Sequence, residues 1–176
     1  MLILLFGVSN VGKTTAGKLL AERLALPFHD LDAEVCAFYE TTLEEFVNRG
    51  TLEDRDRKRG LVMDQLTRDK ASKVIAVTPI SYIKYLKPLL KRQDVIPIEL
   101  RDTPENIFER LVFSDEDDVA YEDNEYKEKH RVYYLREIRE DLKWYGKVYE
   151  GIPNKLDMNN AAPEKVVEDL MKFIPL

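Results

Sequence analysis

The sequence opens with MLILLFGVSNVGKTTAGKLLAERL, residues 1–24, and the order of features in this stretch decides the fold. The apolar run over 2–6 predicts a buried strand. The spacing over 14–25, with Leu20 and Leu24 on one face, predicts an amphipathic helix. Between the two, residues 7–14 fit the pattern G-x-x-x-x-G-K-S/T of a phosphate-binding loop. The stretch therefore predicts a nucleotide-binding loop between a first strand and a first helix.

The residue types in this loop suit the binding of a polyphosphate. Its glycines let the backbone curl so that successive N–H groups point at an anion, and the N-terminus of the following helix adds partial positive charge. Lys13 can reach the β- and γ-phosphates, and Thr14 can offer its hydroxyl to Mg²⁺. The alternative is a strand-to-helix turn with an incidental lysine. We expect the nucleotide to contact Gly7, Ser9, Asn10, Val11, Gly12, Lys13, Thr14 and Thr15.

The rest of the chain continues the alternation of strand and helix patterns. Apolar runs predict further strands at 27–32, 73–78, 95–100 and 154–158. Helical patterns cover 33–49, 52–71, 103–111, 125–149 and 162–174, and Pro79 could open one more helix. This alternation is typical of a parallel sheet with helices on both faces, in which ligands lie at the carboxyl ends of the strands. We expect a single three-layer α/β/α domain over residues 1–176.

Composition and charge limit the partners and the compartment. The formal net charge of −6 argues against a nucleic-acid backbone as the partner. Cys36 is the only cysteine, which excludes an internal disulfide and fits a reducing compartment. No stretch of the sequence is long and apolar enough to span a membrane. We expect a cytoplasmic monomer or weak homodimer that acts on a small-molecule substrate, with neither nucleic acid nor membrane as a partner.

Two carboxylates near the end of the expected second strand narrow the kind of reaction. Asp30 and Asp32 are two residues apart, so both side chains would face the same side of an extended strand. One carboxylate could hold a metal ion, directly or through water. The other could orient an acceptor hydroxyl and take its proton. The alternative is a helix cap followed by a solvated acid.

At these residues the chain resembles the shikimate kinase family. The family patterns T-x-G-K-x-L-A-x-x-L and F-x-D-x-D fit 15–24 and 28–32, and F-x-x-x-G with an arginine beyond it fits 46–55. The resemblance implies a P-loop kinase of the nucleoside-monophosphate-kinase type, with a five-stranded parallel sheet in the order 2-3-1-4-5. It also implies ATP and Mg²⁺ as cofactors.

The same resemblance assigns roles to individual side chains. It implies Asp30 near magnesium, Asp32 on substrate hydroxyls and Arg55 on a substrate carboxylate. A planar guanidinium suits a carboxylate because it makes two parallel charge-assisted bonds. The resemblance also implies that Arg110 packs on adenine. Without it, Arg55 and Arg110 would be interpreted as charges on solvated helix faces.

Several departures from the family pattern fall on the acceptor side. A glycine-rich run after the third strand is replaced by Val-Thr-Pro-Ile-Ser at 77–81, and a glutamate is replaced by Lys58. An arginine of the long helix would fall on Asp141, with Arg136 and Arg139 nearby on other faces. We predict that Thr78 and Arg139 contact the substrate.

The expected lid, about 113–126, is the other departure. Its stretch 114–125 is rich in Asp and Glu and contains no Lys or Arg. An acidic lid would repel a nucleotide unless a basic residue at its far end, Lys127, Lys129 or Arg131, contacts the phosphates instead. The part of the family pattern that binds the phosphoryl donor is therefore present, and the part that binds the acceptor is altered.

The sequence predicts transfer of the γ-phosphoryl group of ATP to a hydroxyl of a small, anionic metabolite, with Lys13 and Asp32 as catalytic residues and shikimate as the leading candidate. Residues 52–57, LEDRDR, also resemble the L-T-D-x-D-R stretch of gluconate kinases, which would shift importance from Arg55 to Asp56 and Arg57. Two alternatives remain open. One is a gluconate kinase-like or nucleotide kinase-like enzyme, and the other is a nucleotide-binding protein that has lost kinase activity.

Overall fold

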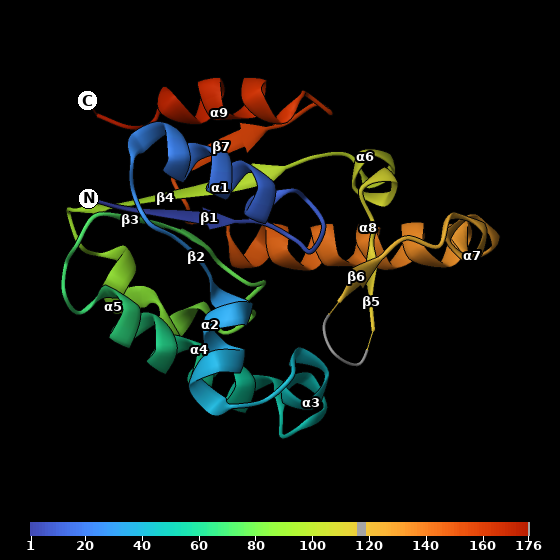
Figure 1. The fold of residues 1–176 in the computed structure, drawn as a ribbon, viewed down its shortest axis with the longest axis horizontal. Coiled ribbons are helices and arrows are strands. Elements are labelled where there is room, and N and C mark those ends of the chain that lie inside the picture. The colour runs from blue at the N-terminus through green and yellow to red at the C-terminus, as the bar shows by residue number, and fades with distance from the viewer. Residues whose placement is uncertain (116–118, 176) are drawn as a thin grey trace.

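A five-stranded sheet, parallel throughout, forms the centre of the fold in the order β2-β3-β1-β4-β7 (Figure 1). Its strands are β1 (Leu2–Phe6), β2 (Phe28–Asp30), β3 (Lys73–Ala76), β4 (Val95–Arg101) and β7 (Asn154–Asp157). The computed structural model describes residues 1–115 and 119–175. Because β7 is the fifth strand of this sheet along the chain, the predicted order 2-3-1-4-5 is confirmed.

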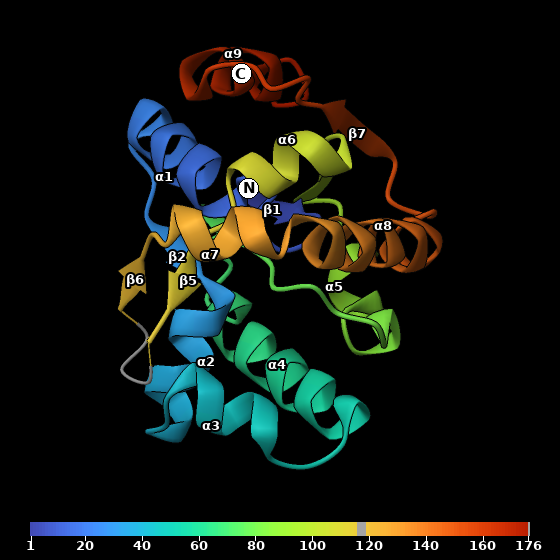
Figure 2. The ribbon, with the colours of Figure 1, turned by 90° about the vertical axis from the view of Figure 1, so that its right-hand side faces the viewer.

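Helices cover both faces of the sheet, as Figures 1 and 2 show. On one side lie α1 (Lys13–Leu24), α6 (Pro104–Glu109) and α9 (Pro163–Met171), and on the other lie α4 (Leu52–Thr67) and α5 (Lys87–Leu90). The alternation along β1 separates the two cores. Ile3 and Leu5 pack with α1 and α9, whereas Leu4 and Phe6 pack with α4 and the C-terminal end of the longest helix.

The remaining elements surround the carboxyl ends of the strands (Figure 2). On one side are α2 (Leu31–Tyr39) and α3 (Leu43–Asn48), and η1 (Ile83–Tyr85) precedes α5. On the other side are the hairpin β5 (Phe113–Ser114) and β6 (Ala120–Tyr121), followed by α7 (Asn124–Lys129) and α8 (Arg131–Val148). The hairpin and the start of α7 lie within the predicted lid, of which residues 116–118 fall outside the described residues.

Several boundaries differ from the sequence prediction, each for a local reason. The second strand ends at Asp30, because the Asp30 side chain caps α2. The helix expected over 33–49 breaks where Glu40 adopts a left-handed conformation and Thr42 caps α3. The long helix expected over 125–149 breaks at His130, which separates α7 from α8. Pro79 opens no helix, and residues 77–80 have no regular secondary structure.

Candidate active site

The loop between β1 and α1 has the backbone of an anion-binding cradle. Gly7 has a φ of +142°, and a Cβ there would lie 2.6 Å from the Leu100 carbonyl oxygen. Gly12 has a φ of +109° and begins α1 without any side-chain cap. Asn10 is also left-handed, with a φ of +59°. The loop therefore needs its glycines, and the first amides of α1, which no side chain of the described residues caps, can bind a phosphate.

Lys13 lies inside this loop rather than on the surface. Its Nζ donates to the carbonyl oxygens of Gly7, at 3.0 Å, and Val8, at 2.8 Å. Burial lowers the pKa of Lys13 to about 8, although the carboxylates of Asp32 and Asp30 act in the opposite direction. A bound phosphate would supply a strong negative partner for this buried ammonium group.

Asp30 joins the loop to the second strand. The Thr14 hydroxyl donates to the Asp30 carboxylate at 2.7 Å, and the same carboxylate caps α2 by accepting from the Asp32 amide at 3.1 Å. Asp30 is therefore a helix cap and a neighbour of the loop hydroxyl at the same time. A hydroxyl and a carboxylate in contact at the mouth of a phosphate loop are a donor set that suits Mg²⁺.

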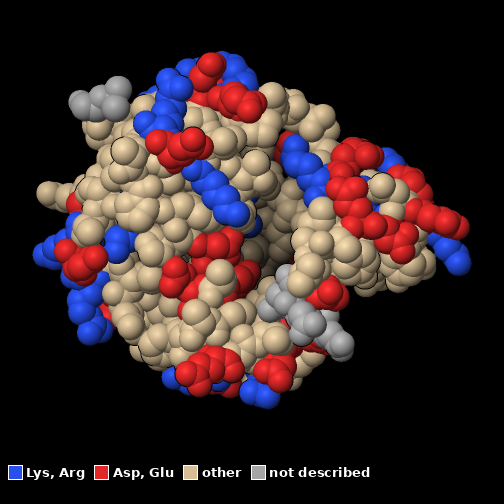
Figure 3. All heavy atoms as spheres, viewed as in Figure 1, with Lys and Arg blue, Asp and Glu red and all other residues tan. Residues whose placement is uncertain are grey.

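Asp32 reaches the site from the first turn of α2 and not from a strand. Its Oδ1 lies 3.6 Å from the Arg59 guanidinium and has no hydrogen-bond partner among the described residues. Burial is the largest cause of a raised Asp32 pKa, which the Thr78 hydroxyl and Arg59 partly oppose. Figure 3 shows acidic side chains gathered over the start of α2, beside a hollow in the surface. Asp32, in the first turn of α2, is a carboxylate that can accept a proton.

The sequence pattern did not single out Arg59, which is the buried arginine of α4. Arg59 is 5% exposed, and its Nη1 donates to the fully buried Asp56 at 3.1 Å. Asp56, Arg59, Val62 and Met63 lie on one buried face of α4, at helical spacing. Counting back from the apolar Val62 and Met63 by one turn gives Arg59, and by two turns gives Asp56. The gluconate kinase-like register did single out Asp56, but Arg57 beside it is exposed.

Arg55, the predicted carboxylate ligand, faces another direction. It is half-buried, and its Nη1 donates at 3.1 Å to the carbonyl oxygen of Gly50, two residues before the start of α4. Lys58, in the position of a family glutamate, extends over the rings of Tyr39 and Phe46. Lys58 is therefore occupied by aromatic faces of α2 and α3.

The segment after β3 is held by side chains in place of glycines. The Ile80 amide donates to the Tyr149 hydroxyl at 3.0 Å. The amides of Ser81 and Tyr82 both donate to Asp56 Oδ2, each at 2.9 Å. Thr78, at the start of the segment, is 7% exposed, and its hydroxyl has no hydrogen-bond partner among the described residues. This segment thus turns Thr78 toward Asp32 while its later amides are already bonded.

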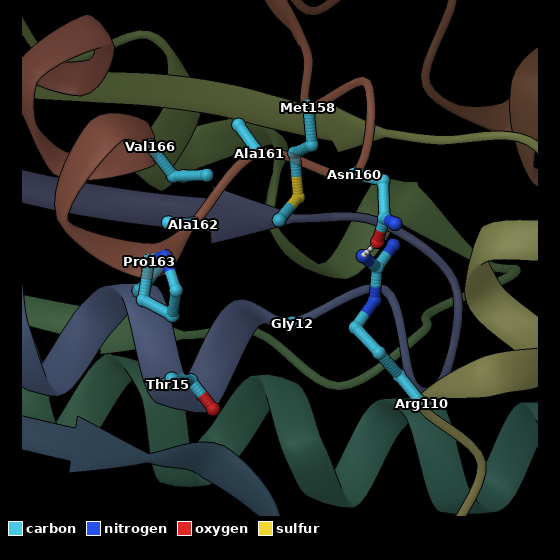
Figure 4. Close-up of a pocket in the computed structure, with 10 residues that line it drawn as sticks. Gly12, Thr15, Arg110, Met158, Asn160, Ala161, Ala162, Pro163 and Val166 are labelled. Carbon is cyan, nitrogen blue, oxygen red and sulfur yellow. Dashed lines mark hydrogen bonds between the residues drawn. The ribbon is translucent and has the colours of Figure 1, made fainter.

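A pocket of about 300 Å³ opens beside the phosphate loop (Figure 4). Gly12 and Thr15 lie on one side and Met158 and Pro163 on the other. Arg110 stands at its edge, where its guanidinium donates to Asn160 Oδ1 at 3.2 Å and also pairs with Asp102. The predicted adenine-binding arginine therefore lies next to the predicted phosphate loop.

Arg139 does not lie with the acceptor-side residues. Its Nη2 donates to Glu105 of α6 at 2.8 Å, and both side chains are more than half exposed. The bases at the far end of the predicted lid also face α6: Lys127 donates to the Glu109 carbonyl oxygen and Arg131 pairs with the Glu109 carboxylate. Asp115 lies at the start of the acidic stretch, and Glu116, Asp117 and Asp118 lie outside the described residues.

The sheet order and the glycine-rich loop between β1 and α1 define the fold as that of a P-loop kinase. The family model described as shikimate kinase matches residues 9–175, and the chain belongs to that family. No helix in residues 1–115 and 119–175 has the length and apolar character needed to cross a membrane.

Solved structures show the same fold at low sequence identity. Shikimate kinase from Bacteroides thetaiotaomicron gives a TM-score of 0.78 at 19% identity, covering 100% of this chain and 99% of its own. Shikimate kinase from Acinetobacter baumannii, solved in complex with shikimate, gives a TM-score of 0.73 at 23% identity, covering 97% of this chain and 90% of its own. Shikimate kinase from Aquifex aeolicus gives a TM-score of 0.67 at 21% identity, covering 98% of this chain and 95% of its own. A comparison with curated proteins found no match. Family and fold together support an ATP-dependent small-molecule kinase.

Proposed function

We propose that this protein transfers the γ-phosphoryl group of ATP to a hydroxyl group of a small metabolite. The observation that carries the proposal is the meeting of two sets of groups at the carboxyl ends of the strands. Lys13 and Thr14 belong to a loop built for phosphates, and Asp30 and Asp32 lie beside them at the start of α2. Phosphoryl transfer needs chiefly such positioning and charge stabilisation.

Each group has a definite role in the proposed reaction. The loop amides and Lys13 hold the β- and γ-phosphates, and Arg110 lies beside the base. Thr14 and Asp30 would hold Mg²⁺, which neutralises phosphate charge when bound. The acceptor oxygen forms a bond to the γ-phosphorus as the bond to the bridging oxygen of ADP breaks, and Asp32 takes the proton of the acceptor hydroxyl. Closure of the segment 113–126 would exclude water.

The acceptor is the open part of the proposal. Family membership makes shikimate the first named candidate, and the resemblance of 52–57 to gluconate kinases makes gluconate the second. We place Asp32 and Thr78 against the acceptor hydroxyls. Arg55 and Arg139, predicted as further contacts, would have to leave Gly50 and Glu105 to reach it. We also propose that the enzyme works in the cytoplasm as a monomer or weak homodimer.

A coupled assay of ADP release tests the proposed function. The purified protein is incubated with Mg-ATP and, in turn, shikimate, gluconate, nucleoside monophosphates and uncharged polyols, with Lys13→Ala as the inactive control. Acceptor-dependent ADP release by the wild type, and its loss in the variant, supports a kinase. Binding of ATP without turnover of any acceptor would instead favour a nucleotide-binding protein that has lost catalysis.

A further inference from the structure

The buried arginine of the acceptor side already has its charge balanced. Arg59 Nη1 is bonded to Asp56 at 3.1 Å, and Arg59 Nη2 lies 3.6 Å from Asp32. Asp56 is fully buried and Arg59 is 5% exposed, so this pair is a fixed part of the protein interior. One guanidinium thus faces two carboxylates before any acceptor arrives. An acceptor carboxylate would be a third anion competing for the same cation.

The backbone donors near this arginine are also occupied. An acceptor carboxylate could otherwise bind N–H groups of the segment after β3. Asp56 accepts from both the Ser81 and the Tyr82 amide at 2.9 Å, and the Tyr149 hydroxyl accepts from the Ile80 amide. The protein's own carboxylate therefore fills a site formed by two amides and a guanidinium, which is a typical binding site for a carboxylate.

A further acid lies on the α8 side of the same region. Tyr145 of α8 connects to the segment through Ser81, whose Oγ donates to the Tyr145 hydroxyl at 3.4 Å, and its pKa is raised mainly by burial and further by Asp141 and Asp56. Asp141 lies one helical turn before Tyr145, on the same face of α8. Burial raises the pKa of Asp141, and the neighbouring carboxylates of Glu137 and Glu140 raise it further. Here too an acceptor carboxylate would meet like charge.

The unpartnered atoms of the site show what it can bind. Asp32 Oδ1, Arg59 Nε and Thr78 Oγ1 are buried without a hydrogen-bond partner among the described residues. Arg59 Nε can only donate, Asp32 Oδ1 can only accept while ionised, and Thr78 can do both. A hydroxyl both donates and accepts, so neighbouring hydroxyls could satisfy all three groups. A carboxylate group placed against Asp32 could only accept, which would leave Asp32 unpartnered and opposed by like charge.

From this arrangement we infer that the acceptor is an uncharged polyhydroxyl compound, bound through its hydroxyls by Asp32, Arg59 and Thr78, and that the site selects against acceptors carrying a carboxylate. Arg59 here donates to hydroxyl oxygens, with Asp56 holding it in position. The inference rests on the proposed kinase function and names the class of its substrate.

Matched acceptor pairs that share their hydroxyls and differ in charge test the inference. Shikimate is compared with methyl shikimate, and gluconate with gluconamide, by kcat/KM for acceptor-dependent ADP release. We expect the uncharged member of the productive pair to be preferred by about 10-fold or more, because like charges in a desolvated site are strongly unfavourable. Preference for the carboxylate member would overturn the inference while leaving the kinase function standing. No turnover in either pair, with ATP bound, would overturn both.

Charge reversal on α8 provides a second readout. Asp141→Arg should raise the relative kcat/KM for the carboxylate member by about 10-fold, since it replaces repulsion by attraction at the site. The matched control is Glu140→Arg, which makes the same change of charge at the adjacent exposed position. An unchanged preference in Asp141→Arg, or an equal shift in both variants, would contradict the role of local charge in acceptor selection.

Discussion

Removal of the Asp56 carboxylate is the most demanding test of the site's architecture. Asp56 is fully buried and accepts hydrogen bonds from the Ser81 amide, the Tyr82 amide and Arg59. Asp56→Ala would leave these three donors without an acceptor, one of them a buried cation. Breaking a buried ion pair from one side costs about 3–5 kcal/mol. That is a large part of the roughly 5–15 kcal/mol by which a domain is stable.

Urea unfolding followed by circular dichroism measures this loss directly. A decrease of about 3–5 kcal/mol corresponds to a decrease in Tm of roughly 6–20 °C in a chain of this length. Asp64→Ala is the matched control, because Asp64 is on the same helix and its side chain is 74% exposed in its pair with Arg68. The control should unfold like the wild type. A loss below about 1 kcal/mol in Asp56→Ala would refute the claim that Asp56 organises Arg59 and the segment after β3.

Three further predictions concern the nucleotide and the proton. The pKa of Lys13 in the folded protein, about 8, lies below that of a free lysine, so above pH 8 the unfolded chain binds more protons than the folded one. The free energy of unfolding of the ligand-free protein, measured in urea, should therefore increase by about 2–3 kcal/mol from pH 8 to 10. Lys13→Met should lack this increase. Asp32→Asn should lower kcat by about 10²–10⁴-fold, and an unchanged kcat would exclude Asp32 as the base. Because the pKa of Asp32 is raised, the acidic limb of the wild-type pH–rate profile should lie above the pH range in which an exposed aspartate titrates. Arg110→Ala should weaken ATP binding by about 2–5-fold in calorimetry, through loss of the cation beside the base, and tighter binding would count against that contact.

The parts of the fold that were predictable depend on local patterns. Residues 2–6 are apolar without interruption and fully buried, and the glycines and lysine that follow fit the pattern of a phosphate-binding loop. The alternation of strands and helices then leaves few possible topologies, and the five-strand order followed from the family resemblance.

The acceptor side was less predictable because tertiary contacts decide it. Asp32 was expected on a strand, but the cap made by Asp30 starts α2 one residue after the strand. Arg55 and Arg59 are one turn apart in a run of charges, and only the packing of α4 shows which one is buried. The amides of Ser81 and Tyr82 meet Asp56 from 25 and 26 residues away. No short sequence pattern encodes such a pairing.

The proposed kinase function requires that the backbone of residues 7–14, together with Lys13 and Thr14, binds a polyphosphate. Isothermal titration of Mg-ATP into the purified protein tests it most directly, with Lys13→Ala measured in parallel. We expect saturable binding of one ATP per chain, weakened by about 10-fold or more in the variant through loss of a buried charge-assisted contact. Absence of binding by the wild type at millimolar ATP with magnesium present would contradict it.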